Sequence, residues 1–362
     1  MTETDGTLKT EIIETYGTPC AVIDLDVVER NIAKAQARCD EAGMANRPHI
    51  KTHKSPILAN MQIAAGARGI TCQKLGEAEV MANAGITDIL LATNLLGAAR
   101  SGRLAALQER LPLKLCADNP VSLKAYSTAA STAGRAIDVL IECDTGQQRA
   151  GVETPHEALA LAASIKADPM LNFAGLLYYP PLDGWQRTQQ FHDKVTSGLT
   201  ELGLSADIVS TGGTPNFINI GKLKEATEHR AGTCIFNDRM MMQAGMATIE
   251  DCAMRVYTSV VSRGGDERGI LDAGSKTLTS DSGGLDGYGL ILEHPNARIH
   301  KFAEEHGFLD LAGCNRKPEV GDVVRVIPNH VCVAVNMVDR LVAVRGTDVV
   351  DEIPVAARGM LV

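Results

Sequence analysis

Short β-branched runs alternate with helical patterns over most of the first 250 residues. The runs AVIDLD, RGITCQ, DILLA and DVLIECD have strand character, and apolar positions at helical spacing follow them. Two of these helical stretches stop at a glycine: Val27–Ala42 before Gly43, and Gly76–Ala84 before Gly85. Eight or so such units between residues 21 and 246 predict an α/β fold with a (β/α)8 TIM-type barrel.

The pattern changes near Asp251. RVYTSVVSR, VVRVIP and VCVAVN are continuous or period-two β-branched runs, separated by Gly, Asp and Pro. They predict strands of a separate C-terminal β domain. A chain of 362 residues suits two domains. We therefore expect an N-terminal segment (1–20) that packs on the β domain, a barrel (21–246) and a β-strand domain (247–362).

Composition narrows the functional classes. The apolar fraction of 45% is ordinary for a globular protein, and the formal net charge of -9 argues against a nucleic-acid partner. The N-terminus is polar and acidic, unlike a secretory signal, and no apolar run approaches the roughly 20 residues of a membrane span. Nine scattered cysteines, an odd number, indicate reduced thiols. We expect a cytoplasmic protein with no membrane partner.

The first candidate for chemistry is Lys51 in RPHIKTHK, where an early barrel strand should end. Pro48 favours an extended entry to this segment. A lysine at a barrel mouth can be partly desolvated and flanked by cations, which lowers its pKa and frees its amine. The alternative is that Lys51 and Lys54 are surface charges. His49 and His53 alternate with Lys51 and are either loop histidines or site residues.

Two late loops are candidates for phosphate binding. STGGT follows the strand ADIV, and AGT ends at Thr233 one strand later. Glycines at such ends expose backbone N–H groups to a phosphate, and barrel phosphate sites are often built at the late strands. Either loop alone is more often a plain turn, but together they predict a phosphate site. The loop DTGQQRAG adds a cation, Arg149, although Asp and Gly are common in turns.

A possible metal pair lies in PNHVC, within the predicted β domain. Residues two apart on a strand point to the same face, so His330 and Cys332 could chelate one ion, and imidazole with thiolate suits zinc. The alternative is that Cys332 belongs to the core. His306 in EEHG is a further candidate for the site. The other histidines are interpreted as solvated helix or loop positions: His156, His192, His229, His294 and His300.

These motifs, together and in this order, resemble the D-threonine aldolase and D-serine dehydratase family, which are fold-type III pyridoxal-phosphate enzymes related to alanine racemase. The likeness runs from TPCAVIDLD to PVAARG, and RPHIKTHK is its most specific part. It implies pyridoxal 5'-phosphate as cofactor, with Lys51 as the Schiff-base lysine. It also implies a divalent metal on His330 and Cys332, with zinc favoured over manganese or magnesium.

The resemblance assigns further roles. Gln73 and Tyr179 are similar to residues that line the cofactor, Arg149 to an arginine that faces its phenolic oxygen, and Asp281 to an acidic residue near the mouth of the active site. The implied phosphate cradle comprises Thr211, Gly212, Gly213, Thr214, Gly232 and Thr233. Enzymes of this plan are commonly dimers, so a homodimer acting on a small amino-acid substrate is expected.

The implied activity is that of a lyase on β-hydroxy-D-amino acids. Proton removal from the α carbon by Lys51, with loss of the β-hydroxyl, gives a keto acid and ammonia, as in a D-serine or D-threonine dehydratase. Retro-aldol cleavage gives glycine and an aldehyde, as in D-threonine aldolase, with His53 as a candidate base. Dehydratases carry Cys at the position of Cys332, where aldolases usually carry Asp, which favours dehydration.

Two other functions are alternatives. An amino-acid racemase would need a second base, for which Tyr257 and Tyr288 are the only tyrosines of the β domain. A non-catalytic carrier of pyridoxal phosphate is typically a lone barrel. The predicted β domain and the pair of His330 and Cys332 argue against a carrier.

Overall fold

The computed structural model describes residues 3–362, and the chain forms two compact units. The barrel unit comprises Lys34–Lys51, Pro56–Gly232 and Met360–Val362. The sheet unit comprises the segment up to Ala33, Thr52–Ser55 and Thr233–Gly359. Each unit is therefore assembled from segments that are far apart in the sequence.

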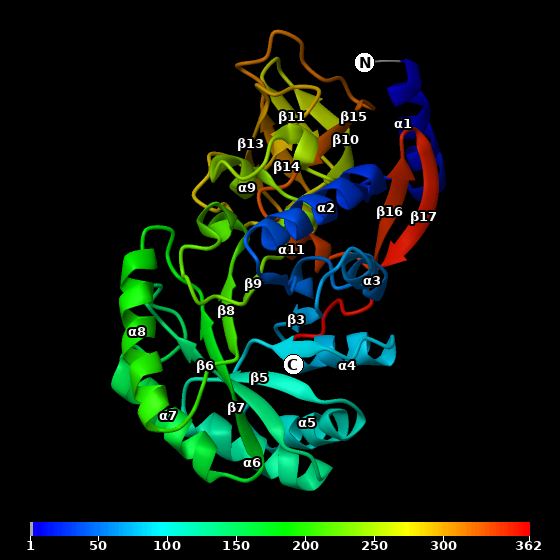
Figure 1. Ribbon diagram of the computed structural model, residues 1–362. Helices are drawn as coiled ribbons and strands as arrows, with labels where there is room; N and C mark the ends of the chain where they lie inside the picture. Colours follow the sequence, from blue (N-terminus) through cyan, green and yellow to red (C-terminus); the bar gives the residue numbers. More distant parts are fainter. Residues whose placement is uncertain (1–2) are drawn as a thin grey trace. The chain divides into compact units, whose positions relative to one another are not determined.

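Eight parallel strands form the barrel unit (Figure 1). In chain order they are β2 (Ala45–Asn46), β3 (Ile70–Cys72), β4 (Ile89–Leu91), β5 (Leu113–Ala117), β6 (Ile137–Cys143), β7 (Leu171–Tyr178), β8 (Ile208–Gly212) and β9 (Glu228–Arg230). β2 pairs with β9, and the bridge from His49 to Thr71 joins the first strand to β3. The sheet is therefore closed, which confirms the predicted barrel.

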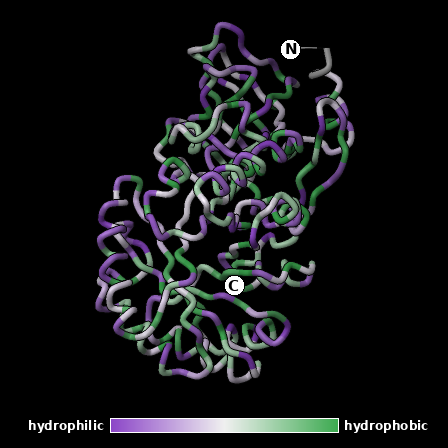
Figure 2. The backbone as a smooth tube through the Cα atoms, viewed as in Figure 1, coloured by the Kyte–Doolittle hydropathy of each residue, from purple (hydrophilic) through white to green (hydrophobic). Residues whose placement is uncertain are grey.

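Helices follow the strands from β2 to β7. They are α3 (Pro56–Ala64), α4 (Leu75–Asn83), α5 (Ala98–Arg110), α6 (Pro120–Ala133), α7 (Pro155–Ala167) and α8 (Trp185–Glu201). α2 (Leu25–Glu41) precedes β2, and only the 3-10 turns η2 (Thr214–Asn219) and η3 (Thr233–Ile235) follow β8 and β9. Hydrophilic and hydrophobic residues alternate along α8 (Figure 2), whose buried residues include Phe191 and Val195. This amphipathic pattern is what predicts the helices from the sequence.

Ionic side chains occupy part of the barrel interior. Arg47 is completely buried; its Nε donates to Glu228 Oε2 at 2.8 Å and its Nη1 to Asp88 Oδ1 at 2.7 Å. Ser210 Oγ donates to the other oxygen of Glu228, at 2.7 Å, and accepts a hydrogen bond from Arg230. A connected polar network therefore extends from the start of β4 to the end of β9, where a purely apolar filling would be the simpler packing.

The sheet unit contains nine strands, with the order β13-β14-β11-β10-β1-β16-β17; β15 pairs with β10 and β12. Their bounds are β1 (Cys20–Asp24), β10 (Met254–Gly264), β11 (Arg268–Leu271), β12 (Leu290–Ile291), β13 (Arg298–Phe302), β14 (Gly307–Asp310), β15 (Val323–Ile327), β16 (Arg340–Arg345) and β17 (Asp348–Pro354). The remaining helices of this unit are α1 (Glu3–Tyr16), α9 (Arg239–Gln243), η4 (Ile249–Asp251), α10 (Ser275–Leu278) and α11 (Val331–Val335).

β1 lies in this sheet and not in the barrel. Its residues pair with β10 on one side, as in Cys20 with Tyr257, and with β16 on the other, as in Val22 with Val342. A continuous apolar strand is typical of any sheet that is buried on both faces. The run AVIDLD alone therefore did not distinguish a strand of the barrel from a strand of the second sheet. The expected domains, 21–246 and 247–362, are each continuous in the sequence. Each compact unit of the structure instead combines several separate segments.

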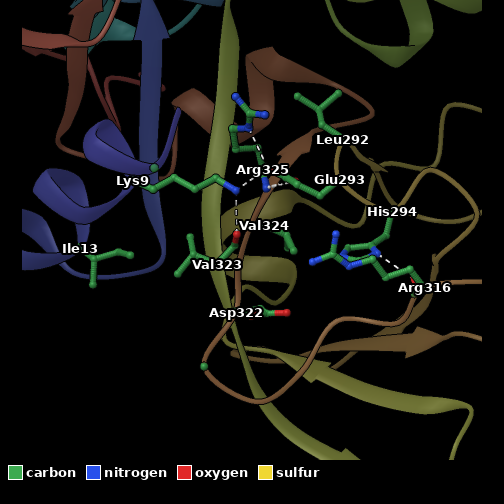
Figure 3. A pocket seen from close by; sticks show the side chains of 12 residues that line it. Lys9, Ile13, Leu292, Glu293, His294, Arg316, Asp322, Val323, Val324 and Arg325 are labelled. Atoms are coloured by element: carbon green, nitrogen blue, oxygen red, sulfur yellow. Dashed lines mark hydrogen bonds and ion pairs between the residues drawn. The ribbon is translucent and has the colours of Figure 1, made fainter. Parts of the chain in front are cut away.

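The helix α1 is anchored on the sheet unit by apolar and ionic contacts. Leu8 and Ile12 belong to a buried cluster with Tyr257, and α1 lies beside β16 and β17 (Figure 1). Lys9 Nζ donates to Glu293 Oε1 at 2.6 Å and to the Val323 carbonyl at 3.0 Å (Figure 3). A pocket of about 580 Å³ adjoins this ion pair, and none of the predicted site residues lines it.

The segment VCVAVN, predicted as a strand, forms the short helix α11. His330 precedes the helix with an extended backbone, and the Val331 N–H donates to Asp238 Oδ2 at 3.1 Å. The N–H of Arg239 binds the Pro328 carbonyl in the same region. These tertiary contacts outweigh the β propensity of the valines, which is a weak and context-dependent preference. Within residues 3–362, no helix is both long and apolar enough to span a membrane.

The polar network generates the first prediction. Glu228→Gln should lower the free energy of unfolding by about 3 kcal/mol, because it leaves the Arg47 guanidinium buried without its main counter-ion. The matched control is Glu79→Gln, which removes a half-exposed ion pair with Arg103 and should change stability by less than about 1 kcal/mol. Urea denaturation of the purified variants measures both. Equal losses in the two variants would contradict a special role for the interior pair.

Candidate active site

Lys51 lies in the 3-10 turn η1 (Ile50–Thr52), after the first barrel strand. Its side chain is exposed, and its ammonium group makes no hydrogen bond or ion pair with any residue of the described part of the chain. Its backbone N–H points to His49 Nδ1, at 3.4 Å. The structure therefore presents a free amine at the strand end that the sequence analysis selected.

His49 and Gln73 hold this turn through hydrogen bonds. Gln73 Nε2 donates to the Ala92 carbonyl at 2.9 Å, so its Oε1 is the atom that accepts from His49 Nε2, at 3.1 Å. The imidazole proton therefore lies on Nε2, and Nδ1 is left to accept from the Lys51 backbone. Burial, together with the nearby Lys51, holds the pKa of His49 well below its usual range. His49 is thus a neutral residue that connects the Gln73 side chain to the backbone of Lys51.

Arg149 and Tyr179 come together at the ends of β6 and β7. The Asp144 carboxylate accepts the N–H groups of Gly146 and Arg149, at 2.7 and 2.9 Å, which shapes the loop after β6. The Arg149 guanidinium then lies over the Tyr179 ring, 4.7 Å from its centre. The nearest carboxylate oxygen to Arg149 belongs to Glu142, at 3.9 Å. The loop therefore presents a mostly exposed cation whose position is set by the backbone.

Two glycines at the end of β8 allow close packing of neighbouring side chains. Gly213 has φ 100°, and a Cβ there would lie 2.7 Å from the Tyr179 ring. A Cβ on Gly212 would lie 3.1 Å from Arg230 Nη2. The Gly213 N–H donates to the Arg230 carbonyl at 2.7 Å, which holds this loop beside the end of β9. Only glycine lets the Tyr179 ring and the Arg230 guanidinium pack this closely against the loop. Lys51, Arg149 and Arg230 all lie near enough to His49 to lower its pKa. This group of cations fits an anionic, lysine-linked cofactor.

Thr211 differs from its assigned role in the phosphate cradle. Its side chain is buried, and its Oγ1 lies 2.9 Å from His229 Nδ1. His229 Nε2 lies 3.1 Å from the Gly213 carbonyl oxygen, which can only accept, so Nδ1 accepts from Thr211. The Thr211 hydroxyl therefore braces the glycine loop through His229. Thr214, at the start of η2, is also buried.

The sequence analysis missed two residues of this region. His229, interpreted as solvated, is completely buried, and burial lowers its pKa to about 3. Arg230, which was not singled out, donates to the Tyr178 carbonyl at 3.1 Å and places a second cation beside Gly212. The short strand EHR carries only polar letters, so no periodicity marks it as buried. His192, also interpreted as solvated, is buried against Tyr178 at 3.2 Å.

His330 and Cys332 are neighbours in the sheet unit, although a helix start and not a strand brings them together. The hydrogen bond with Cys332 is the main cause that raises the pKa of His330 to about 9, and the hydrogen bond that His330 donates to Asp281 is a further cause. His330 Nδ1 lies 2.6 Å from Asp281 Oδ2. A carboxylate on one ring nitrogen leaves the other for a metal, the usual arrangement of metal-binding histidines. Asp281 therefore supports His330.

Few side chains that could bind a metal lie near His330 and Cys332. Among residues 3–362 no group of three or more His, Cys, Asp and Glu side chains is arranged to hold a metal ion. Thr52 Oγ1 lies 3.2 Å from Cys332 Sγ, and Thr233 Oγ1 lies 3.8 Å from the same sulfur. One imidazole nitrogen and one sulfur are two of the three protein ligands that a catalytic zinc usually has.

His53 and His306, two further candidates for the site, lie in different surroundings. His53 is completely buried, and its Nδ1 accepts the Ser55 N–H at 3.1 Å. Nδ1 is therefore already engaged by the backbone. His306 is exposed between β13 and β14, and its side chain makes no hydrogen bond or ion pair within residues 3–362.

A closed barrel with a lysine and two arginines grouped at its strand ends is the arrangement of the alanine-racemase type of enzyme. Residues 23–240 match the family model described as "Alanine racemase, N-terminal domain", and residues 253–344 match "Putative serine dehydratase domain". The chain belongs to the family that contains D-threonine aldolase and D-threo-3-hydroxyaspartate dehydratase, and it is a pyridoxal-phosphate-dependent lyase.

Three relatives illustrate the match. D-threonine aldolase of Arthrobacter sp. is 35% identical over 94% of this chain and 93% of its own length. The crystal structure of D-threonine aldolase from Filomicrobium marinum is 31% identical, with a TM-score of 0.89 over 95% of this chain and 96% of that chain. D-threo-3-hydroxyaspartate dehydratase from Delftia sp. HT23 is also 31% identical, with a TM-score of 0.86 over 94% and 97%. That dehydratase was also solved as a Cys-to-Ala variant in a metal-free form and as a His-to-Ala variant two positions earlier.

The buried histidine behind the glycine loop generates a prediction about pH. Because the pKa of His229 is about 3 when folded and 6.5 for a free imidazole, protons bind the unfolded chain first as pH falls. This histidine should therefore remove about 2 kcal/mol of stability between about pH 7.5 and about pH 5. His229→Gln should show a shallower loss over the same interval, measured by urea unfolding at both pH values. Parallel pH profiles for the two proteins would contradict the assignment.

Proposed function

We propose that this enzyme is a pyridoxal-phosphate- and divalent-metal-dependent dehydratase of β-hydroxy-D-amino acids, which releases a keto acid and ammonia. One observation carries the proposal. Lys51, with its free amine, is joined by one peptide bond to Thr52, whose hydroxyl lies 3.2 Å from Cys332 Sγ. The lysine that would hold the cofactor is therefore adjacent along the chain to a residue that binds the candidate metal ligand.

The barrel unit supplies the groups for the cofactor. Lys51 would bind it covalently, the loop of Gly212 and Gly213 with Arg230 would lie against its phosphate, and Arg149 would bind an oxygen of its ring. Pyridoxal phosphate, when bound, withdraws electrons from the α carbon of an amino acid. Lys51 has no competing partner among the described residues, so its amine is available to take the α proton.

The sheet unit supplies the groups for the metal. His330 Nε2 and Cys332 Sγ would hold it, while Asp281 fixes the imidazole through Nδ1. A divalent ion there would act as a Lewis acid toward the substrate hydroxyl. Support comes from the dehydratase of Delftia, whose variants concern a His and a Cys at the same spacing, the Cys variant being metal-free.

Dehydration is preferred over retro-aldol cleavage for two reasons. Cys332 stands where dehydratases of this family carry Cys, and aldol cleavage needs a base for the β-hydroxyl proton. His53, the candidate base, is completely buried, and its Nδ1 already accepts the Ser55 N–H. Cleavage to glycine and an aldehyde is the second candidate, because an aldolase relative is 35% identical.

Racemisation is less well supported by the tyrosines of the sheet unit. Tyr257 is buried in an apolar cluster with Leu8 and Ile12, and the Tyr288 ring packs on Phe302 with centres 4.7 Å apart. Burial of Tyr257 removes it from contact with a dissolved substrate. Tyr257 is therefore disfavoured as the second base for two-sided proton exchange.

The deciding experiment is a product assay. The cofactor-loaded enzyme is given D-serine and D-threonine, with and without a chelator, and keto acid, ammonia, glycine and acetaldehyde are measured. We expect keto acid and ammonia, lost on chelation and restored by zinc or manganese. Glycine and acetaldehyde from D-threonine would establish the aldolase instead, and L-amino acids as products would establish a racemase.

The role of Lys51 has a separate test. Lys51→Ala should lose both the visible absorbance band of lysine-bound cofactor and all lyase activity, because no other amine replaces the covalent link. Lys222→Ala, an exposed lysine on the outside of the barrel unit, is the matched control and should keep both. Absorbance spectra and borohydride trapping followed by peptide mapping measure the link. A labelled peptide that lacks Lys51 would refute the assignment.

A further inference from the structure

The hydroxyl of Thr52 contacts the candidate metal thiolate. Thr52 Oγ1 lies 3.2 Å from Cys332 Sγ, within the range of an O–H···S hydrogen bond, and Thr52 is completely buried. Thr233 Oγ1 lies 3.8 Å from the same sulfur, a longer and weaker contact. Both threonines and Cys332 belong to the sheet unit.

The chemistry of the sulfur determines the direction of these bonds. A cysteine that binds a metal does so as a thiolate, which has lone pairs but no proton. The Thr52 hydroxyl must then donate its single proton to the sulfur. Hydrogen bonds to a charged sulfur are stronger than neutral ones and draw electron density away from the metal–sulfur bond.

The backbone on both sides of this contact is held firmly. The Val331 N–H, next to Cys332, is bound by the buried Asp238 carboxylate, which also accepts the Met241 N–H at 2.9 Å. On the other side the Lys51 N–H points to His49 Nδ1. Because neither backbone can easily move, the hydroxyl–sulfur distance is a fixed property of the fold.

We propose that Thr52 is a positioning residue for the metal site: its hydroxyl donates to Cys332 Sγ, fixes the rotamer of the thiolate and tunes its bond to the metal. Thr233 makes the same contact more weakly. The inference rests on the proposed function, since it requires Cys332 to be a metal ligand. It adds a role for the threonine of the KTH segment, which would otherwise be a buried residue without a function.

The test uses Co2+ as the probe. Full-length, cofactor-loaded protein is stripped of metal and titrated with Co2+, and the sulfur-to-cobalt charge-transfer band and the affinity are recorded. Thr52→Val removes the hydroxyl at nearly constant shape. It should weaken Co2+ binding by about 10-fold, because the thiolate loses the donor that fixes its rotamer and stabilises its charge. It should also move the band to longer wavelength, because the sulfur electrons lose a hydrogen bond. Thr52→Ser, which keeps the hydroxyl, should restore the wild-type band and affinity.

Matched variants separate the possible results. Thr233→Val should produce a smaller shift than Thr52→Val, and Thr52→Ala replaces the valine variant if valine prevents folding, as judged by circular dichroism. An unchanged band and affinity in Thr52→Val, with a normal band in the wild type, would overturn the role of Thr52 and leave the proposed function intact. Equal losses in the valine and serine variants would overturn it too. A band that persists in Cys332→Ala would overturn both, since the sulfur would not be the ligand.

Discussion

The buried ion pair between Arg47 and Glu228 is the contact on which the arrangement of the barrel unit depends. It joins the first barrel strand, β2, to the last, β9, inside the closed sheet. A guanidinium without solvent requires both its carboxylate partners in place, so the pair sets the register of these strands. Four residues after Arg47 the chain reaches Lys51, and two residues after Glu228 it reaches Arg230. The pair therefore positions the lysine and the glycine loop by the same constraint.

Two other kinds of residue position the loops of the candidate site. They are neutral histidines and acidic side chains that accept hydrogen bonds from backbone N–H groups. His49 and His229 are buried and uncharged, and each connects a side chain to the backbone of a functional loop. Asp144 and Asp238 bind backbone N–H groups beside Arg149 and Cys332 in the same manner. None of these four residues needs to touch a substrate. Such rigid supports keep loops precise, and a loop that is loose by a fraction of an ångström loses catalytic geometry.

Much of the fold and part of the candidate site could be predicted from the sequence. The repeated strand–helix pattern identified the barrel, because its period is local, and RPHIKTHK located Lys51 at a strand end. The partner sheet of β1 and the helix at Val331–Val335 were missed, because both depend on contacts with distant segments. His229 was misjudged for a related reason: a polar strand inside a barrel is paired with charges that no local pattern reveals. Long-range pairing, and not propensity, decided each of these cases.

The pairing of β1 has a consequence for dissecting the protein. β1 is an interior strand between β10 and β16, but residues 34–232, with most of the barrel unit, separate it from both in the sequence. A recombinant fragment of residues 247–362 would lack it and expose two long unpaired edges, which favour aggregation. It would also lack Thr52 and Asp238, which contact the Cys332 sulfur and the Val331 N–H. The chain must therefore be expressed and evolve as one piece, and a catalytic module cannot be cut from it at a domain border.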